Sequence, residues 1–259
     1  MDLDGAGVVV TGAARGIGEA IARRLHAGGA RLVLADRDAA ELQALADELG
    51  AHAVAGDVAS DAGVATLVAA ARNHLGRIDV FYANAGIGLL TGLAETTDEQ
   101  WEQVFAVNVM AHVRAARHLL PVWEEQGGGR FVVTASAAGL LTMLGDPSYS
   151  ASKHAAVGFA EWLSASYRHR GVVVQAICPQ GVATRMLDGS GGLAGLLSHD
   201  RALAPAEVAE AAAAALDSEA FYVLPHPEVA DYSALRATDP DRWLTGMNKL
   251  QRKFEAAST

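Results

Sequence analysis

The sequence has a single cysteine, Cys178, and no histidine, cysteine or acidic residues grouped at the spacing of metal ligands. An internal disulfide is therefore excluded. The thiol lies in the apolar run 172–178, so we expect it to be buried rather than reactive. No apolar stretch approaches the roughly 20 residues that span a bilayer. These absences predict a protein without a metal site, a disulfide or a membrane span.

Basic residues are also scarce, with 20 Lys and Arg against 30 Asp and Glu, a net charge of −10 and a pI near 5.3. Such a balance argues against nucleic acid or an anionic membrane as a partner. The segment that begins with Asp2 and Asp4 lacks the basic-then-apolar pattern of a signal peptide, so we expect a cytoplasmic protein. The nine histidines are scattered, and each is expected at the surface or on the side of a helix.

The 259 residues fit one large α/β domain spanning 1–259, with no low-complexity linker and no repeat of fixed period. Short apolar runs alternate with segments of helical character, which predicts a doubly wound parallel sheet with helices on both faces. Seven runs are candidate strands: 7–11, 31–35, 51–55, 78–82, 130–134, 172–178 and 221–224.

A glycine-rich turn, Gly12 to Gly18, joins the first strand directly to a helix. This arrangement offers free backbone N–H groups to a phosphate, and glycine allows the backbone to approach it closely. No Lys-Ser/Thr pair closes the turn, so it is not a Walker-type loop. Asp36 ends the second strand about 18 residues later, where a dinucleotide site places its ribose-binding acid. A dinucleotide site is predicted, although a glycine turn alone is weak support.

Tyr149 and Lys153 are four residues apart, one helical turn, and Ala156, Ala160 and Leu163 continue that stripe as an apolar face. A cation about 4 Å from a phenolate contributes roughly 4 kcal/mol at an effective dielectric of 20, which would lower a tyrosine pKa by up to about three units. Such a tyrosine exchanges protons with a ketone or alcohol near neutral pH. The alternative is an ordinary helix with a packed tyrosine and a snorkelling lysine.

Two further polar residues and one loop are candidates for the site. Asn108 shares the apolar face of its helix, where an amide needs partners or costs about 1–3 kcal/mol. Ser136 follows the fifth strand, at the edge where ligands of such sheets bind. The glycine-rich segment at about 185–204 is a candidate substrate lid, with a simple mobile loop as the alternative.

TGAARGIG at 11–18, Asp57, NAG at 84–86, Asn108, Ser136 and YSASK at 149–153 together resemble the classical short-chain dehydrogenase/reductase family. Their order and spacing match over residues 5–224. The resemblance implies a Rossmann-type fold with a seven-stranded sheet. It also implies an NAD(P)-dependent oxidoreductase that interconverts secondary alcohols and ketones without a metal.

The resemblance also implies a role for each matching residue. Tyr149 would be the general acid/base, Lys153 would lower its pKa and bind the nicotinamide ribose, Ser136 would orient the substrate oxygen, and Asn108 would hold a proton-relaying water. The cofactor-binding residues implied are Gly12, Arg15, Gly16, Ile17, Gly18, Asp36, Arg37, Asp57, Val58, Asn84, Ala85, Gly86, Tyr149, Lys153, Pro179, Gly181, Val182 and Thr184.

The chain departs from the family pattern in two places. Pro179-Gln180 stands where many relatives have Pro-Gly, which puts an amide near the nicotinamide or the substrate. A C-terminal extension follows at about 225–259, and within it a helix over 240–256 carries one apolar stripe of Trp243, Met247, Leu250 and Phe254. Core packing is the expected role of this helix, and covering its own or a neighbour's active site is the alternative.

The candidate substrate pocket, placed by the family fold, is mainly apolar and favours a hydrophobic alcohol or ketone over a phosphorylated or carrier-bound one. Its residues are Leu89, Leu90, Leu141, Met143, Gln180, Met186 and Leu187. A catalytically silent dinucleotide sensor is the alternative from another class, but all four catalytic residue types are present. A methyltransferase would leave Tyr149 and Lys153 unexplained.

Asp36 favours NAD, because its carboxylate would repel the 2′-phosphate of NADP. Arg15 and Arg37 argue for NADP, since they stand where NADP-using relatives bind that phosphate; an NADP-dependent carbonyl reductase is thus the alternative within the family. The resemblance also implies a homotetramer, which we expect from Trp123, Phe159 and Trp162 as surplus apolar surface on the helices that would pack together.

Overall fold

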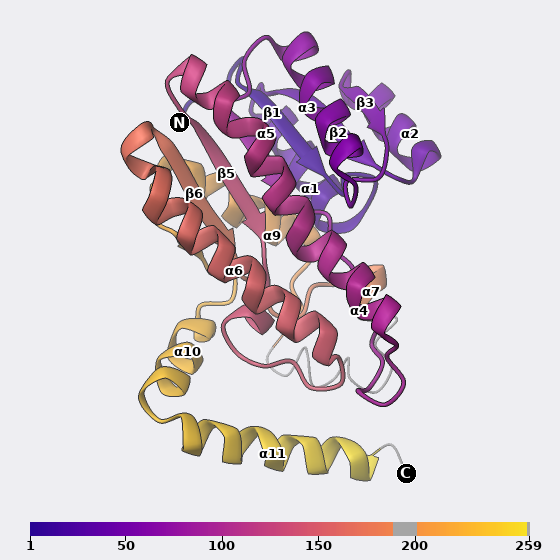
Figure 1. Ribbon diagram of the computed structural model, residues 1–259, viewed down its shortest axis with the longest axis vertical. Coiled ribbons are helices and arrows are strands. Elements are labelled where there is room, and N and C mark those ends of the chain that lie inside the picture. The colour runs from indigo at the N-terminus through magenta and orange to yellow at the C-terminus, as the bar shows by residue number, and fades with distance from the viewer. Residues whose placement is uncertain (189–200, 258–259) are drawn as a thin grey trace.

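The centre of the protein, in the computed structural model, is a parallel sheet with the strand order β3-β2-β1-β4-β5-β6-β7. The structure describes residues 1–188 and 201–257, so most of the predicted lid lies outside the described residues. The strands are β1 (Gly7–Thr11), β2 (Arg31–Asp36), β3 (His52–Ala55), β4 (Val80–Ala83), β5 (Gly129–Thr134), β6 (Val172–Ile177) and β7 (Tyr222–Val223). This confirms the predicted seven-stranded, doubly wound sheet (Figure 1).

The apolar composition of the inner strands follows from burial on both faces. Val8, Val9 and Val10 of β1 have no exposed surface. Alternate residues of one strand face opposite helix layers, so a strand covered on both sides needs an unbroken apolar run. The central strands are accordingly rich in valine and leucine, whereas β3 at the edge is only partly buried.

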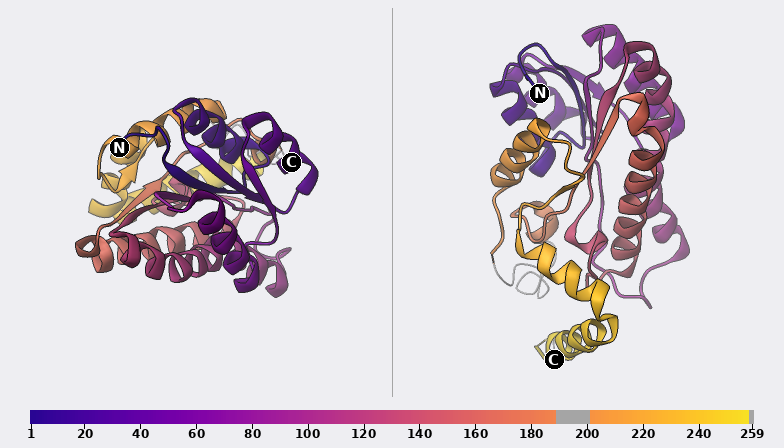
Figure 2. Two further views of the ribbon diagram at one scale, coloured as in Figure 1. Left: turned by 90° about the horizontal axis from the view of Figure 1, so that it is seen from above. Right: turned by 90° about the vertical axis from the view of Figure 1, so that its left-hand side faces the viewer.

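Helices cover both faces of the sheet (Figure 2). One layer packs on Val8 and Val10 and the other on Val9 and Phe81, through separate apolar cores. The first layer contains α1 (Gly16–Ala27), α2 (Ala39–Leu49) and α9 (Pro205–Ala214). The second contains α3 (Asp61–Leu75), α5 (Ala111–Gln126) and α6 (Pro147–Tyr167).

The remaining described helices gather around the carboxyl ends of the strands or link the main elements. Figure 1 shows α11 lying across the end of the molecule at which α4, α7 and the start of α6 are found. These elements are α4 (Asp98–Phe105), the π-helical turn η1 (Ala106–Met110), η2 (Ala137–Gly139), η3 (Arg168–Arg170), α7 (Arg185–Asp188), η5 (Ala215–Asp217), α10 (Glu228–Thr238) and α11 (Pro240–Ala257). The predicted helix over 240–256 is thus confirmed as α11.

Trp123, His112 and His226 are all buried. Trp123 is fully buried, with its indole N–H donating to the carbonyl of Ile78 at 2.8 Å and its ring edge packed on Phe131. It therefore adds nothing to the outer surface of α5. His112, on the side of α5, is 2% exposed, and His226 is 3% exposed. The prediction that every histidine lies at the surface or on the side of a helix is wrong for His226, which comes before α10. No helix in the described part of the chain could cross a membrane.

Candidate active site

A cavity of about 1480 Å³ opens at the carboxyl ends of the strands. It extends past the ends of β1 and β4, where the strand order reverses, the usual place for a ligand in an open α/β sheet. Cavities for one drug-sized molecule are about 300–1,000 Å³, so this one has room for a dinucleotide and a substrate together. Every residue predicted above to bind the cofactor lines it.

The glycine turn has the geometry of a phosphate cradle. Gly12 has a φ of +64°, and a Cβ there would lie 2.8 Å from the Cα of Ala85; a Cβ on Gly18 would lie 2.1 Å from the carbonyl oxygen of Gly12. Only glycine fits either position. The residue before α1, Arg15, supplies no side-chain cap, which leaves the first N–H groups of the helix to an outside acceptor. This end of the cavity therefore fits the pyrophosphate of a dinucleotide.

Asp36 and Arg15 line the cavity beside the glycine turn. The carboxylate of Asp36 accepts hydrogen bonds from the N–H groups of Ala14 (3.0 Å) and Asp38 (3.1 Å), which fixes it beside the glycine turn. Arg15 is held by acids: its guanidinium lies 2.7 Å from Asp38 and 3.5 Å from Glu41. Arg15, one of the two cations expected to offset Asp36, is thus already paired within the protein, and Arg37, the other, also lines the cavity.

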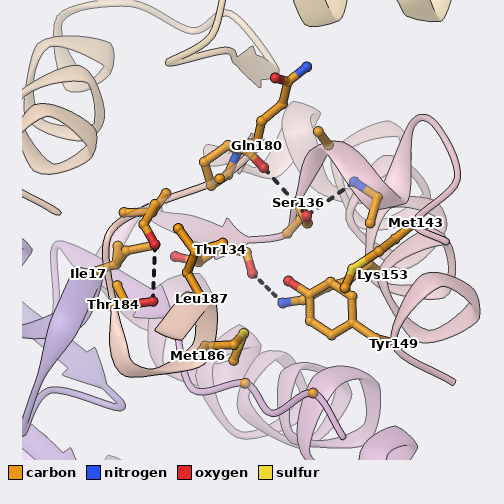
Figure 3. A pocket seen from close by; sticks show the side chains of 18 of the residues that line it. Ile17, Thr134, Ser136, Met143, Tyr149, Lys153, Gln180, Thr184, Met186 and Leu187 are labelled. Atoms are coloured by element: carbon orange, nitrogen blue, oxygen red, sulfur yellow. Dashed lines mark hydrogen bonds between the residues drawn. The ribbon is translucent and has the colours of Figure 1, made fainter. Parts of the chain in front are cut away.

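Tyr149, Lys153 and Ser136 face the same part of the cavity, off the end of β5 (Figure 3). Lys153 is 3% exposed, and its Nζ donates to the carbonyl of Thr134 at 2.9 Å and lies 5.5 Å from the centre of the Tyr149 ring. The hydroxyl of Ser136 accepts from the N–H of Ala138 at 3.1 Å and donates to the carbonyl of Pro179 at 3.4 Å. A phenol, an ammonium and a hydroxyl are therefore held together by backbone groups.

Burial decides the charge state of this site. It raises the pKa of Tyr149 above its usual value, with a partial offset from hydrogen bonding to Ser136. Burial also lowers the pKa of Lys153 to about 8. The net lowering of the tyrosine pKa expected from Lys153 is therefore not found, because desolvation of the buried phenol is the largest effect. Near neutral pH Tyr149 is a protonated phenol and Lys153 carries a charge.

Asn108 lies behind the cavity wall rather than in it. Its amide donates to the carbonyl of Ile87 and to the hydroxyl of Ser152, both at 2.9 Å, and its oxygen accepts from the N–H of Ile87 at 2.8 Å. These bonds tie the loop after β4 to α6, and the residue sits in the π-helical turn. A Cβ on Gly86 would lie 3.3 Å from Lys153 Nζ and 3.4 Å from Asn108 Oδ1, so both groups border one small space.

Asp146 was missed in the sequence. Its fully buried carboxylate accepts from the N–H groups of Leu89 and Leu90, each at 2.8 Å, from the hydroxyl of Ser148 at 2.8 Å and from the N–H of Tyr149 at 2.9 Å. It is the N-cap of α6 and also holds the loop of the cavity wall. An Asp followed by Pro before a helical run is the usual N-cap signal and would have located it.

Most of the predicted substrate residues line the cavity. Leu89 does not; its backbone is directed to Asp146 instead. The six that do are Leu90, Leu141, Met143, Gln180, Met186 and Leu187. The backbone N–H of Gln180 donates to His226 Nδ1 at 3.1 Å, which anchors the loop after β6.

The C-terminal helix α11 also lines the cavity, which the sequence offered only as an alternative to core packing. Trp243, Met247 and Leu250 of the predicted stripe are half-buried along it, and Trp243 packs on Tyr232 of α10. Arg242 and Lys249 of the same helix line the cavity as well. Among the described residues no cluster of His, Cys, Asp and Glu has the arrangement of a metal site.

Comparison with known proteins finds relatives that align with most of this chain. Residues 6–191 match the model of the short chain dehydrogenase family. Galactitol 2-dehydrogenase (L-tagatose-forming) of Cereibacter sphaeroides is 41% identical over 190 residues, 71% of this chain and 74% of that protein. The 1-deoxy-11-beta-hydroxypentalenate dehydrogenase of Streptomyces exfoliatus is 38% identical over 231 residues, 86% of this chain and 84% of that protein.

Solved structures show the same similarity. A short chain dehydrogenase/reductase from Burkholderia phymatum, crystallised in complex with NAD, superposes with a TM-score of 0.85 at 31% identity. The alignment covers 93% of this chain and 96% of that one.

Proposed function

This chain belongs to the short-chain dehydrogenase/reductase family, and we propose that it transfers a hydride between NAD(H) and a secondary alcohol or ketone. The observation that carries the proposal is the position of Tyr149, Lys153 and Ser136 in the wall of the same cavity as the glycine turn. A proton donor for the substrate oxygen and a glycine turn that can bind a dinucleotide thus line the same cavity.

The residues that would hold NAD run along one side of the cavity. The turn from Gly12 to Gly18 would bind the pyrophosphate, Asp36 the adenosine ribose, and Asp57 with Val58 the adenine. Lys153 and the segment from Pro179 to Thr184 would bind the nicotinamide half. When bound, the nicotinamide ring would give or accept the hydride.

Tyr149 acts as the general acid when a ketone is reduced, since its raised pKa keeps the phenol protonated at neutral pH. Ser136 orients the substrate oxygen by donating a second hydrogen bond, for which its hydroxyl turns away from its long bond to Pro179. The charge of Lys153 favours the phenolate that forms as the proton leaves. When an alcohol is oxidised, the proton transfer is reversed, and the phenolate of Tyr149 accepts the proton of the substrate hydroxyl.

The space between Lys153 Nζ and Asn108 Oδ1 beside Gly86 would hold a water of the relay that returns a proton to Tyr149 by way of Lys153. A water there would accept from Lys153 and donate to the amide oxygen, which has a lone pair left besides the one facing Ile87. Asn108 would then position the relay while its own N–H groups stay bonded to Ile87 and Ser152.

NAD is the cofactor rather than NADP. Asp36 is fixed at the ribose position by two backbone N–H groups, and Arg15 is paired with Asp38. The superposed Burkholderia phymatum enzyme carries NAD, which supports the same choice.

The substrate is a small hydrophobic alcohol or ketone. Leucine and methionine side chains form much of the wall around Tyr149, beside the polar Ser136, Thr142 and Gln180. Both named relatives are dehydrogenases of hydroxylated compounds, which supports oxidation of an alcohol, although only one of them is named for a sugar alcohol.

A spectrophotometric panel tests this function. Cyclic and linear ketones with NADH or NADPH, and the matching alcohols with NAD or NADP, are assayed for the change in nicotinamide absorbance. We expect turnover of apolar secondary alcohols and ketones with NAD(H). NAD binding without turnover of any member would favour the dinucleotide sensor instead.

A further inference from the structure

Two cations of α11 stand at the substrate end of the cavity. Arg242 and Lys249 are seven residues apart, which puts them within about 20° of each other around the helix and about 10 Å apart along it. Gly246 lies between them on the same face and also lines the cavity. A Cβ on Gly246 would meet nothing within 4 Å, so the surface between the two cations is open.

Neither cation has an ion-pair partner in the described residues. Of the four other arginines of the cavity wall, three are paired: Arg15 with Asp38, Arg23 with Glu19 and Glu48, and Arg185 with Glu41. The fourth, Arg37, follows Asp36 at the dinucleotide end and has no ion-pair partner in the described residues. In a chain with a net charge of −10, two unpaired cations on one face of a helix stand out.

No acid that lines this end of the cavity forms an ion pair with them in the described residues, although Asp239, the residue before α11, accepts from the backbone N–H of Arg242 at 3.0 Å. Asp146 lines the cavity near Tyr149, but its carboxylate is fully buried and directed at four N–H and O–H donors. The other acidic residues of the wall, Glu19, Asp36 and Asp57, belong to the glycine turn and the nearby strand ends that would hold the dinucleotide. Among the described residues of the wall, the charges of Arg242 and Lys249 are therefore unpaired at the α11 end.

Between these cations and Tyr149 the wall is apolar. Trp243, Met247 and Leu250 form the neighbouring stripe of α11, and Met186 and Leu187 lie across from Ser136 and Tyr149 (Figure 3). A ligand reaching from one end to the other would thus meet hydrogen-bond donors at Tyr149, an apolar middle and two cations.

We propose that the substrate is an amphipathic carboxylate: an apolar body with its reacting oxygen at Tyr149 and a carboxylate bound by Arg242 and Lys249. This rests on the proposed function and narrows its substrate class. A singly charged carboxylate suits the site better than a phosphate, because bringing a second charge against an apolar wall costs more desolvation.

The test is calorimetric binding to the protein loaded with NAD. The probes are 5-cyclohexylpentanoate and 5-cyclohexylpentanamide, which share shape and differ in charge. We expect the acid to bind about tenfold more tightly, as two partly exposed ion pairs together provide. In an Arg242→Gln/Lys249→Gln double variant, the ratio of the affinities for the acid and the amide should fall to about one.

The matched control is Arg252→Gln/Lys253→Gln, which removes the same charge from α11 at exposed positions outside the cavity wall. It should keep the tenfold preference. Equal binding of acid and amide, binding of neither, or an equal loss in the control would overturn the proposal. Tyr149-dependent turnover of neutral ketones would survive each of these results, so they would leave the proposed function standing.

Discussion

Asp36 and His112 show how a single side chain can set a measurable property of the whole protein. Asp36 places one negative charge at the edge of the dinucleotide cradle, and His112 is buried beneath the active site with neither ring nitrogen hydrogen-bonded in the described structure. Their effects are separable, since one acts on cofactor choice and the other on stability in acid.

Asp36 should make the enzyme prefer NAD over NADP by more than about tenfold in kcat/KM. Two negative charges about 4 Å apart repel by roughly 1 kcal/mol in water and 4 kcal/mol at an effective dielectric of 20. Asp36→Asn should reduce the preference by about tenfold or more, whereas Asp47→Asn, an exposed acid of α2, should not change it. Equal efficiency of the wild type with both cofactors would show that Arg15 and Arg37 outweigh the acid.

His112 should make the fold sensitive to acid. Burial, with the charge of Lys153, lowers its pKa from 6.5 to about 3. The unfolded chain therefore binds this proton first as the pH falls below 6.5, and stability is lost down to about pH 3. The loss attributable to His112 at pH 4 is about 3 kcal/mol.

Denaturant unfolding between pH 7 and pH 4 measures this effect. His112→Leu should lose less stability over that range than the wild type, whatever its stability at pH 7. His26→Gln, at an exposed position, should follow the wild type. Parallel pH profiles for His112→Leu and the wild type would contradict the assignment.

At the scale of elements, α6 matters most, because its first turn carries Tyr149 and its N-cap is buried. Asp146 satisfies that turn and also the N–H groups of Leu89 and Leu90. Leu90 has a φ of +56°, a conformation that costs a non-glycine residue about 1–2 kcal/mol. The carboxylate therefore holds a strained part of the cavity wall against the catalytic helix.

Removing this carboxylate should lower the free energy of unfolding by more than the loss of an ordinary helix N-cap does. Asp146→Ala is expected to lower the free energy of unfolding by roughly 2–4 kcal/mol, since it leaves buried N–H groups unpaired. Thr97→Ala removes the exposed N-cap of α4 and should cost about 1 kcal/mol. If both variants lose the same free energy of unfolding in chemical denaturation, the hydrogen bonds from Leu89 and Leu90 to Asp146 contribute nothing to stability.

The sequence predicted the elements whose signals are local. Buried strands appeared as valine-rich runs, the dinucleotide cradle as a glycine turn between strand and helix, and α11 as a stripe from Trp243 to Phe254. Each depends on periodicity or on turn chemistry within about ten to twenty residues.

What the sequence missed depends on contacts between distant segments. The π-helical turn places Asn108 where it bonds to Ile87 and Ser152. The hydrophobic periodicity of the sequence does not predict such a turn. The burial of Trp123 has no local signal either, because its carbonyl partner on Ile78 is 45 residues away. The raised pKa of Tyr149 reflects how deeply the fold buries it, which spacing to Lys153 does not reveal.

At the scale of the whole molecule, α6 exposes an aromatic surface. Trp162 is 57% exposed and stacks with Phe159, at 6.4 Å between ring centres, and meets Tyr167 edge-on. Without Trp123, these three rings are the apolar surface that supports the expected homotetramer. Tryptophan is the residue type most often dominant in such contacts.

Light scattering should therefore give the mass of a tetramer at micromolar concentration, and Trp162→Glu should give a smaller species. Leu244→Glu, which changes a comparably exposed apolar residue on α11, should leave the mass unchanged. A monomeric wild type would contradict the expected assembly.

The account as a whole rests on Tyr149 as the proton donor in a cavity that binds NAD(H). The most direct measurement is turnover and NADH binding for Tyr149→Phe, which removes only the hydroxyl. We expect kcat/KM for the best ketone of the panel to fall at least about a hundredfold, since a positioned general acid contributes about 10²–10⁴. NADH affinity, followed by fluorescence, should stay within about threefold of the wild type. Turnover within tenfold of the wild type would contradict the central claim.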